Sequence, residues 1–265
     1  MGRRFASMLV CVLVLTATLS VSVLAADTGY YRRVISKTTH SRIEGYITLP
    51  TAANLAGIDV VDTEAAYNYF GLSPNDGSTW PEFGLFTAPY DSVKGYYVEG
   101  VGNWMVFWNA GTPDGWHTHH WPTKASSPAG STGPNGGIPG GTRVYMKLSV
   151  PTNGTVVFYV SYTYNGVSNS MTQSFLASTY TGLSGVSATG YKNKVKRLTT
   201  LVVTHGGSYS KLNTWSGVSV GTAAGVHEFT TFCAESYTNY PSSSYIQVAP
   251  GYVLWSSETC SIVVP

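Results

Sequence analysis

Aromatic rings on predicted strands are the first group of side chains suited to recognition. Trp104 and Trp108 alternate with Val106, so they project from one face of a strand, while Met105 and Phe107 occupy the other. Tryptophan and tyrosine combine a flat apolar face with a hydrogen-bonding tip, which suits sugar and peptide ligands. The alternative is that these rings fill the interior of a β-sandwich.

Neighbouring predicted strands carry further rings, among them Tyr145 and Tyr159. We predict that Trp104, Trp108, Tyr145 and Tyr159 contact a ligand and that Glu82 supplies a polar anchor. If the protein is instead a hydrolase, Glu82 is the acid or base, and Glu99 or another distant carboxylate completes the pair.

A histidine-rich segment is the second group. His117 and His119 lie on one face of an extended chain, which suits a two-point metal site. The segment supplies no third ligand, although Asp114, His205 or His227 could converge on it in the fold. The alternative is a loop beside an aromatic anchor, and we predict neither a metal nor a cofactor.

Charged side chains elsewhere give weaker signals. Asp59 and Asp62 fall on opposite faces of a predicted strand, which does not suit a glycosidase carboxylate pair. Lys192, Lys194 and Lys196 alternate and therefore share one face. This pattern predicts an edge strand protected from pairing, with a local patch for anionic glycans as the alternative.

Period-two alternation predicts the elements that must position these residues. Segment 143–150 alternates apolar and polar residues, 151–154 forms a turn, and 155–164 returns as the second strand of a hairpin. Loops are predicted at 122–141 and 179–190. The other predicted strands are 42–49, 58–62, 66–71, 82–88, 95–101, 104–109, 170–177, 195–205, 217–221 and 252–255, with helical turns at 52–55 and 229–236. So many short strands predict an all-β fold, a two-sheet antiparallel jelly-roll sandwich.

The N-terminal segment predicts export. Arg3 and Arg4 precede an apolar run that ends before Ala25 and Ala26, the order of a secretory signal peptide. We therefore expect a Sec signal peptide at 1–26, a single β-sandwich domain at 27–265, and a secreted or cell-envelope location.

Two cysteines and a balanced charge remain after residue 26. In an oxidising compartment Cys233 and Cys260 favour a disulfide. Without Arg3 and Arg4 the 15 basic residues of the chain become 13, equal to its 13 acidic residues. This balance argues against nucleic acid as a partner. No further apolar stretch predicts a transmembrane helix, and the oligomeric state cannot be predicted.

The order of motifs between Trp80 and Thr204 resembles that of the glutamic peptidases (eqolisins). The motifs are Trp80, 82–85, the strands at 96–109, and 139–142 before the long hairpin. The resemblance implies a concanavalin-like jelly roll. In that family a glutamine before an Ala-Gly pair and a glutamate in an Ala-Glu-Trp sequence form the catalytic dyad.

This chain departs from the family at both members of that dyad. Glu82 stands where the glutamine would be, and the second strand, 195–201, contains no carboxylate. The chain also resembles YrpD-type secreted proteins of spore-forming bacteria, which implies the same kind of fold. The sequence therefore favours a secreted non-catalytic protein that binds glycans or peptides. The alternatives are a hydrolase of glutamic-peptidase or glycosidase type that uses Glu82, and a structural envelope or spore-coat component.

Overall fold

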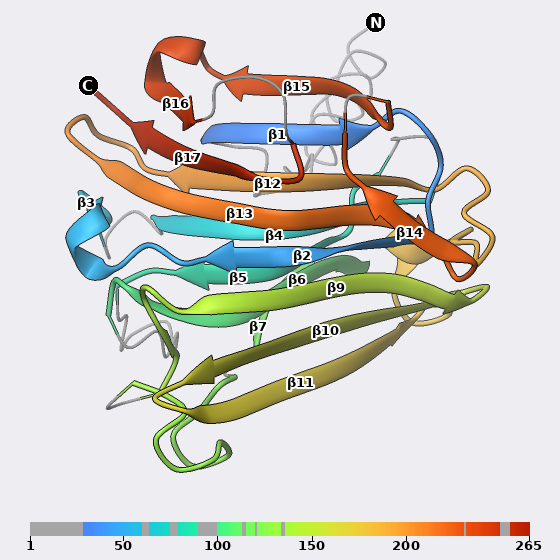
Figure 1. The fold of residues 1–265 in the computed structure, drawn as a ribbon, viewed down its shortest axis with the longest axis horizontal. Coiled ribbons are helices and arrows are strands. Elements are labelled where there is room, and N and C mark those ends of the chain that lie inside the picture. The colour runs from blue at the N-terminus through green and yellow to red at the C-terminus, as the bar shows by residue number, and fades with distance from the viewer. Residues whose placement is uncertain are drawn as a thin grey trace, which may run out of the picture.

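Two antiparallel sheets form the body of the computed structural model (Figure 1). The structure describes residues 29–59, 64–74, 79–89, 100–112, 115–119, 121–133, 136–230, 232–249 and 255–265. The predicted all-β sandwich is confirmed, whereas the predicted signal peptide lies outside the described residues. In the described part of the chain, none of the helices has the length and apolar character needed to cross a membrane.

The first sheet has eight strands. They are β1 (Tyr30–Ser36), β4 (Ala65–Ser73), β5 (Glu82–Thr87), β6 (Asn103–Thr112), β7 (Gly115–His119), β8 (Ile138–Pro139), β12 (Lys194–Val202) and β15 (Ala234–Tyr240). Their order is β15-β1-β12-β4-β5-β6-β7, and β8 pairs with β6.

The second sheet has nine strands. They are β2 (Arg42–Thr48), β3 (Leu55–Ala56), β9 (Arg143–Thr152), β10 (Thr155–Tyr164), β11 (Val167–Leu176), β13 (Tyr209–Thr222), β14 (Gly225–Glu228), β16 (Ile246–Ala249) and β17 (Glu258–Val263). Their order is β11-β10-β9-β2-β13-β17-β16, and β3 and β14 both pair with β13. Three short 3₁₀ turns interrupt the described strands: η2 (Ala52–Asn54), η3 (Thr181–Leu183) and η4 (Ser243–Tyr245).

Aromatic side chains join the two sheets through the core. Phe83 on β5 lies 4.9 Å from Phe175 on β11 and 5.9 Å from Phe158 on β10, measured between ring centroids. Phe70 on β4 packs against Trp215 on β13 in the same way, at 5.3 Å. Each of these rings is fully or almost fully buried, so they face the interior, as the alternation read from the sequence requires.

Local patterns predicted several elements correctly. The hairpin is β9 and β10, joined at Asn153 and Gly154, where Gly154 adopts a φ of 77° that suits a tight turn. The helical turn at 52–55 appears as η2. The helical turn predicted at 229–236 is confirmed only up to Ala234: Cys233 and Ala234 donate backbone hydrogen bonds to Thr230 O, and β15, which pairs with β1, begins at Ala234. Three further strands were predicted at 58–62, 95–101 and 252–255, and most residues of each lie outside the described part of the chain.

The interpretation of the lysines as protection for an edge strand is also wrong. Strand β12 lies between β1 and β4, and its residues Val195 to Leu201 are buried. Lys196 therefore points into a covered part of the first sheet, and the next residue, Arg197, points into the core between the sheets.

Arg197 belongs to a buried cluster of three charges that joins the two sheets. Its guanidinium donates to Glu258 Oε1 on β17 at 2.5 Å, and Arg32 on β1 donates to Glu258 Oε2 at 2.9 Å. All three side chains are at most 3% exposed. Burial alone would raise the pKa of Glu258, but the two guanidinium groups together outweigh it, so that pKa is lowered.

We expect Glu258→Gln to destabilise the protein by about 3–5 kcal/mol, because two guanidinium groups lose their buried counter-charge. Urea unfolding at neutral pH measures the loss. Since the folded state lowers the pKa of Glu258, the contribution is present at neutral pH and is lost as the pH falls from the ordinary pKa of 4.5 through the lowered pKa of the folded state.

The matched control is Glu44→Gln. Its ion pair with Arg42 is partly exposed, so we expect a loss below about 1 kcal/mol. Equal losses for the two variants would contradict a special role for the buried cluster.

Candidate functional site

Three tyrosines lie side by side on the outer face of the nine-stranded sheet. Alternation turns Tyr46 on β2, Tyr145 on β9 and Tyr159 on β10 away from the core. Tyr46 and Tyr145 are register partners with ring centroids 5.1 Å apart, and Tyr145 and Tyr159 are 6.0 Å apart. Each ring is partly exposed, so together they form an open aromatic platform, which we call the tyrosine groove.

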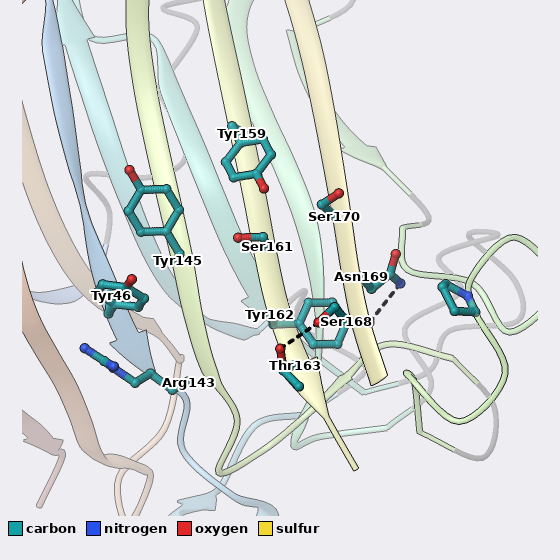
Figure 2. Close-up of a pocket in the computed structure, with 11 residues that line it drawn as sticks. Tyr46, Arg143, Tyr145, Tyr159, Ser161, Tyr162, Thr163, Ser168, Asn169 and Ser170 are labelled. Atoms are coloured by element: carbon teal, nitrogen blue, oxygen red, sulfur yellow. Dashed lines mark hydrogen bonds between the residues drawn. The ribbon is translucent and has the colours of Figure 1, made fainter. Parts of the chain in front are cut away.

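Hydroxyl and amide groups complete the tyrosine groove (Figure 2). The groove has a volume of about 790 Å³ and crosses the sheet from β2 to β11. Thr163 and Ser168 join their hydroxyls at 3.0 Å across β10 and β11. The other described lining residues are Pro128, Arg143, Ser161, Tyr162, Asn169 and Ser170.

Glu44 orients the central ring. The Tyr145 hydroxyl donates to Glu44 Oε2 at 2.6 Å, and Arg42 donates to the same oxygen at 2.6 Å. Burial, and then the Glu44 carboxylate, raise the pKa of Tyr145, so this hydroxyl stays protonated and keeps donating. The orientation of the ring is therefore independent of any ligand.

Arg143 covers one end of the platform. Its guanidinium carbon lies 3.8 Å from the centroid of the Tyr46 ring, a cation–π contact, and its side chain is exposed. A long contact of 3.4 Å joins its terminal nitrogen to Ser216 Oγ.

Glu82 lies elsewhere, on the eight-stranded sheet. Lys196 Nζ on β12 donates to Glu82 Oε1 on β5 at 2.6 Å, and the two side chains are 0% and 2% exposed. Strand β4 runs between them, and Gly71 is the register partner of both residues. A Cβ at Gly71 would lie 2.5 Å from Lys196 Cε, so only glycine leaves room for the lysine to reach across.

Two aromatic rings flank the Lys196 ammonium. It lies 4.9 Å from the centroid of Trp80 and 5.7 Å from that of Tyr69. An ammonium held by a carboxylate and two rings is well stabilised away from water. Glu82 is therefore half of an ion pair and not an acid exposed to solvent.

The structure brings together only two of the predicted ligand contacts, Tyr145 and Tyr159. Contrary to the prediction, Trp104 and Trp108 face the core between the sheets and are 0% and 9% exposed. The Trp104 indole donates to Pro50 O at 3.1 Å, and Trp108 packs on Phe175. The tryptophans fill the sandwich because their strand turns that face toward the second sheet.

The predicted disulfide is absent, and Cys233 and Cys260 are buried free thiols. Cys233 precedes β15 of the first sheet and contacts the backbone of Thr230, whereas Cys260 lies within β17 of the second. Burial raises the pKa of the Cys260 thiol to about 12, which keeps it protonated and unreactive. Each sulfur lies in the apolar core, Cys233 at the turn before β15 and Cys260 within β17.

The predicted metal ligands do not converge in the described part of the chain. His205 pairs with Glu64 at 3.1 Å, and His227 packs on His40 with ring centroids 5.5 Å apart. No group of three suitable ligands occurs among the residues that the structure describes. The side chains of His117 and His119, and the whole of Asp62, Glu99 and Asp114, lie outside that part.

A second cavity, of about 570 Å³, lies beside His40 and His227. Burial, and then the neighbouring His227, lower the pKa of His40 to about 4, so its ring is neutral at physiological pH. Cys233 and the exposed Phe232 also line this cavity.

Sequence reasoning missed Tyr46, Arg143 and the partner of Glu82. The alternation in 42–48 and 143–150 could have placed Tyr46 and Arg143 on outer faces. The register that brings Tyr46 beside Tyr145 joins segments about a hundred residues apart, and no local pattern contains it.

Comparisons with known proteins support the fold. Neither a family model nor a curated protein matches the sequence. Scytalido-glutamic peptidase with a transition-state analogue inhibitor has a TM-score of 0.55 and 10% identity, over 90% of this chain and 100% of that one. SCP-B, a member of the eqolisin family of peptidases, in complex with the tripeptide Ala-Ile-His, has a TM-score of 0.54 and 9% identity over the same shares. The resemblance to the glutamic peptidases is thus confirmed at the level of fold.

Breaking the Glu82–Lys196 pair tests whether it stabilises the sheet. We expect Lys196→Met to lower the free energy of unfolding by about 3–5 kcal/mol, because it leaves a buried carboxylate without its ammonium. In the double variant Lys196→Met/Glu82→Leu no charge remains, so most of that loss is recovered. Urea unfolding of Lys196→Met, of Glu82→Leu and of the double variant gives the coupling energy between the two side chains. Additive losses would show that the pair is not a unit.

Proposed function

We propose that this protein is a secreted, non-catalytic binding protein that holds an extended glycan in the tyrosine groove. The observation that carries the proposal is the exposed row of Tyr46, Tyr145 and Tyr159 in a groove of about 790 Å³. Export rests on the signal-peptide pattern of the first 26 residues.

The composition of the groove favours a glycan over a peptide. Its described lining contains tyrosine, serine, threonine and asparagine, and no leucine, isoleucine, valine or methionine. Peptides are commonly recognised through pockets for apolar side chains or by addition to a strand. Flat rings bordered by hydroxyl groups match the apolar faces and the hydroxyls of sugar rings.

The environment of Glu82 argues against catalysis at that residue. Activation of a water molecule requires a carboxylate that water can reach and a second group that stabilises the oxyanion. Glu82 is 2% exposed and its Oε1 is held by Lys196 at 2.6 Å. The Lys196 ammonium therefore occupies the carboxylate oxygen that a water molecule would have to approach.

A hydrolase of glutamic-peptidase type is the second candidate. The comparisons support it better than they support a binding protein, because the similar solved structures are peptidases. In that case Glu82 acts as the base and Lys196 stabilises the oxyanion, and a substrate has to gain access to both. At 9–10% identity the similarity extends to the fold, and folds host unrelated activities.

Glycan binding is tested with immobilised polysaccharides and a peptide array. We expect Tyr145→Ala and Tyr159→Ala each to weaken binding of the retained polysaccharide about 10-fold or more, because each removes a stacking surface. Tyr191→Ala is the matched control, since Tyr191 is 69% exposed and lies outside the groove. Unchanged binding in both groove variants would refute the proposal.

The hydrolase candidate is tested by peptidase and glycosidase assays from acid to neutral pH. We expect no turnover above background for the wild-type protein. Turnover that Glu82→Gln abolishes, in a variant whose circular dichroism matches the wild type, would establish the hydrolase and overturn non-catalytic binding.

A further inference from the structure

Positive charge accumulates on the outer face that carries the tyrosine groove. Alternation places Arg42, Glu44, Arg143 and Lys147 on this face of β2 and β9. These are three cations and one carboxylate, in a chain that is nearly neutral after residue 26. The excess on this face is therefore local and not a reflection of overall composition.

The one carboxylate in this set is already neutralised. Glu44 accepts from Arg42 Nη2 at 2.6 Å and Nε at 2.9 Å, and from the Tyr145 hydroxyl. Arg42 is therefore already paired with Glu44. Arg143, in contrast, makes no ion pair with the described residues. The guanidinium of Arg143 is the charge in the groove lining that remains available to a ligand.

The position of Arg143 suits a carboxylate that arrives along the platform. Its guanidinium carbon lies 3.8 Å from the centroid of the Tyr46 ring, which holds the side chain, and the edge of the guanidinium makes one long contact, of 3.4 Å to Ser216 Oγ. That edge presents N–H donors in the fork that matches a carboxylate. The stacked arginine is thus pre-organised, and a ligand need not order it.

A second cation extends the same line. Lys147 is on the same face of β9, and its Nζ lies 5.6 Å from the centroid of Tyr159. Successive outward residues of a strand are about 7 Å apart, so Arg143, Tyr145 and Lys147 form a cation–ring–cation row. A polymer that carries a negative charge on repeating sugar units would meet both cations while its rings stack on tyrosine.

We propose that the ligand of the tyrosine groove is an acidic glycan, a polysaccharide whose sugar units carry carboxylates, and that Arg143 binds one of those carboxylates. This proposal rests on the proposed function, because it names the chemical class that the same groove selects. Arg143 is its specificity residue.

The test compares two probes that differ in charge alone. Polygalacturonate and its methyl-esterified form share one backbone, so affinity electrophoresis in gels of each isolates the carboxylate. We expect the wild-type protein to bind polygalacturonate at least about 10-fold more tightly, with affinity that falls as sodium chloride rises.

The variants assign that preference to Arg143. We expect Arg143→Gln to lose about 10–100-fold affinity for polygalacturonate and to change binding of the ester little, because it removes charge-assisted hydrogen bonds. Arg143→Lys keeps the charge without the planar fork and retains part of the affinity. Lys37→Gln, an exposed lysine beyond β1 of the other sheet, is the control and should match the wild type.

The outcomes separate this proposal from the proposed function. Equal binding of both probes, lost in Tyr159→Ala, would overturn the acidic ligand and leave glycan binding in place. A preference for polygalacturonate that survives Arg143→Gln would overturn the role of Arg143. Binding of acidic peptides with no binding of either polysaccharide would overturn both proposals.

Discussion

Strand β12 is the constraint on which the rest of the molecule depends. It is buried on both faces, yet two consecutive residues in it, Lys196 and Arg197, are cations. Because successive side chains of a strand point to opposite faces, each charge needs its own buried partner on its own side. Lys196 finds Glu82 within the first sheet, and Arg197 finds Glu258 across the sandwich. The Lys196–Glu82 pair thereby fixes the position of β5 within the first sheet. The Arg197–Glu258 pair fixes the position of β17 in the second sheet.

The Glu82–Lys196 pair lies in a fold that is similar to that of the glutamic peptidases. The resemblance places the family's glutamine where this chain has Glu82, and the second strand, 195–201, contains no carboxylate. In this chain the Lys196 ammonium donates to the Glu82 carboxylate, and Gly71 provides the opening that the two side chains share. A buried ion pair such as Glu82–Lys196 can stabilise the sheet without changing the surrounding architecture. This agrees with a similarity to the solved peptidase structures that is confined to the fold.

Local pattern was sufficient for many of the strands, although it missed β1, β7, β14, β15, β16 and β17, and it was insufficient for the site. Alternation in 143–150 and the turn at Asn153 and Gly154 predicted the hairpin correctly, because both signals are contained in neighbouring residues. The lysines of β12 misled the prediction, since alternation reports which residues share a face and not whether that face is covered. The tryptophans misled it for the same reason: a strand that is apolar on both faces does not reveal which face meets the second sheet. Cys233 and Cys260 were paired by composition and compartment, and the fold gives each thiol its own place in the core.

The two outer faces of the sandwich differ in how much aromatic surface they leave exposed. On the eight-stranded sheet, rings that turn away from the core, including Tyr69, Phe86 and Phe107, form a second buried cluster. On the nine-stranded sheet, Tyr46, Tyr145 and Tyr159 stay partly exposed although they alternate out of the core in the same way. Rings in the covered cluster already bury their apolar area within the protein, so a ligand has little to gain there. The exposed tyrosines still have that area to bury, and the Glu44–Tyr145 hydrogen bond holds the central ring in place before any ligand arrives.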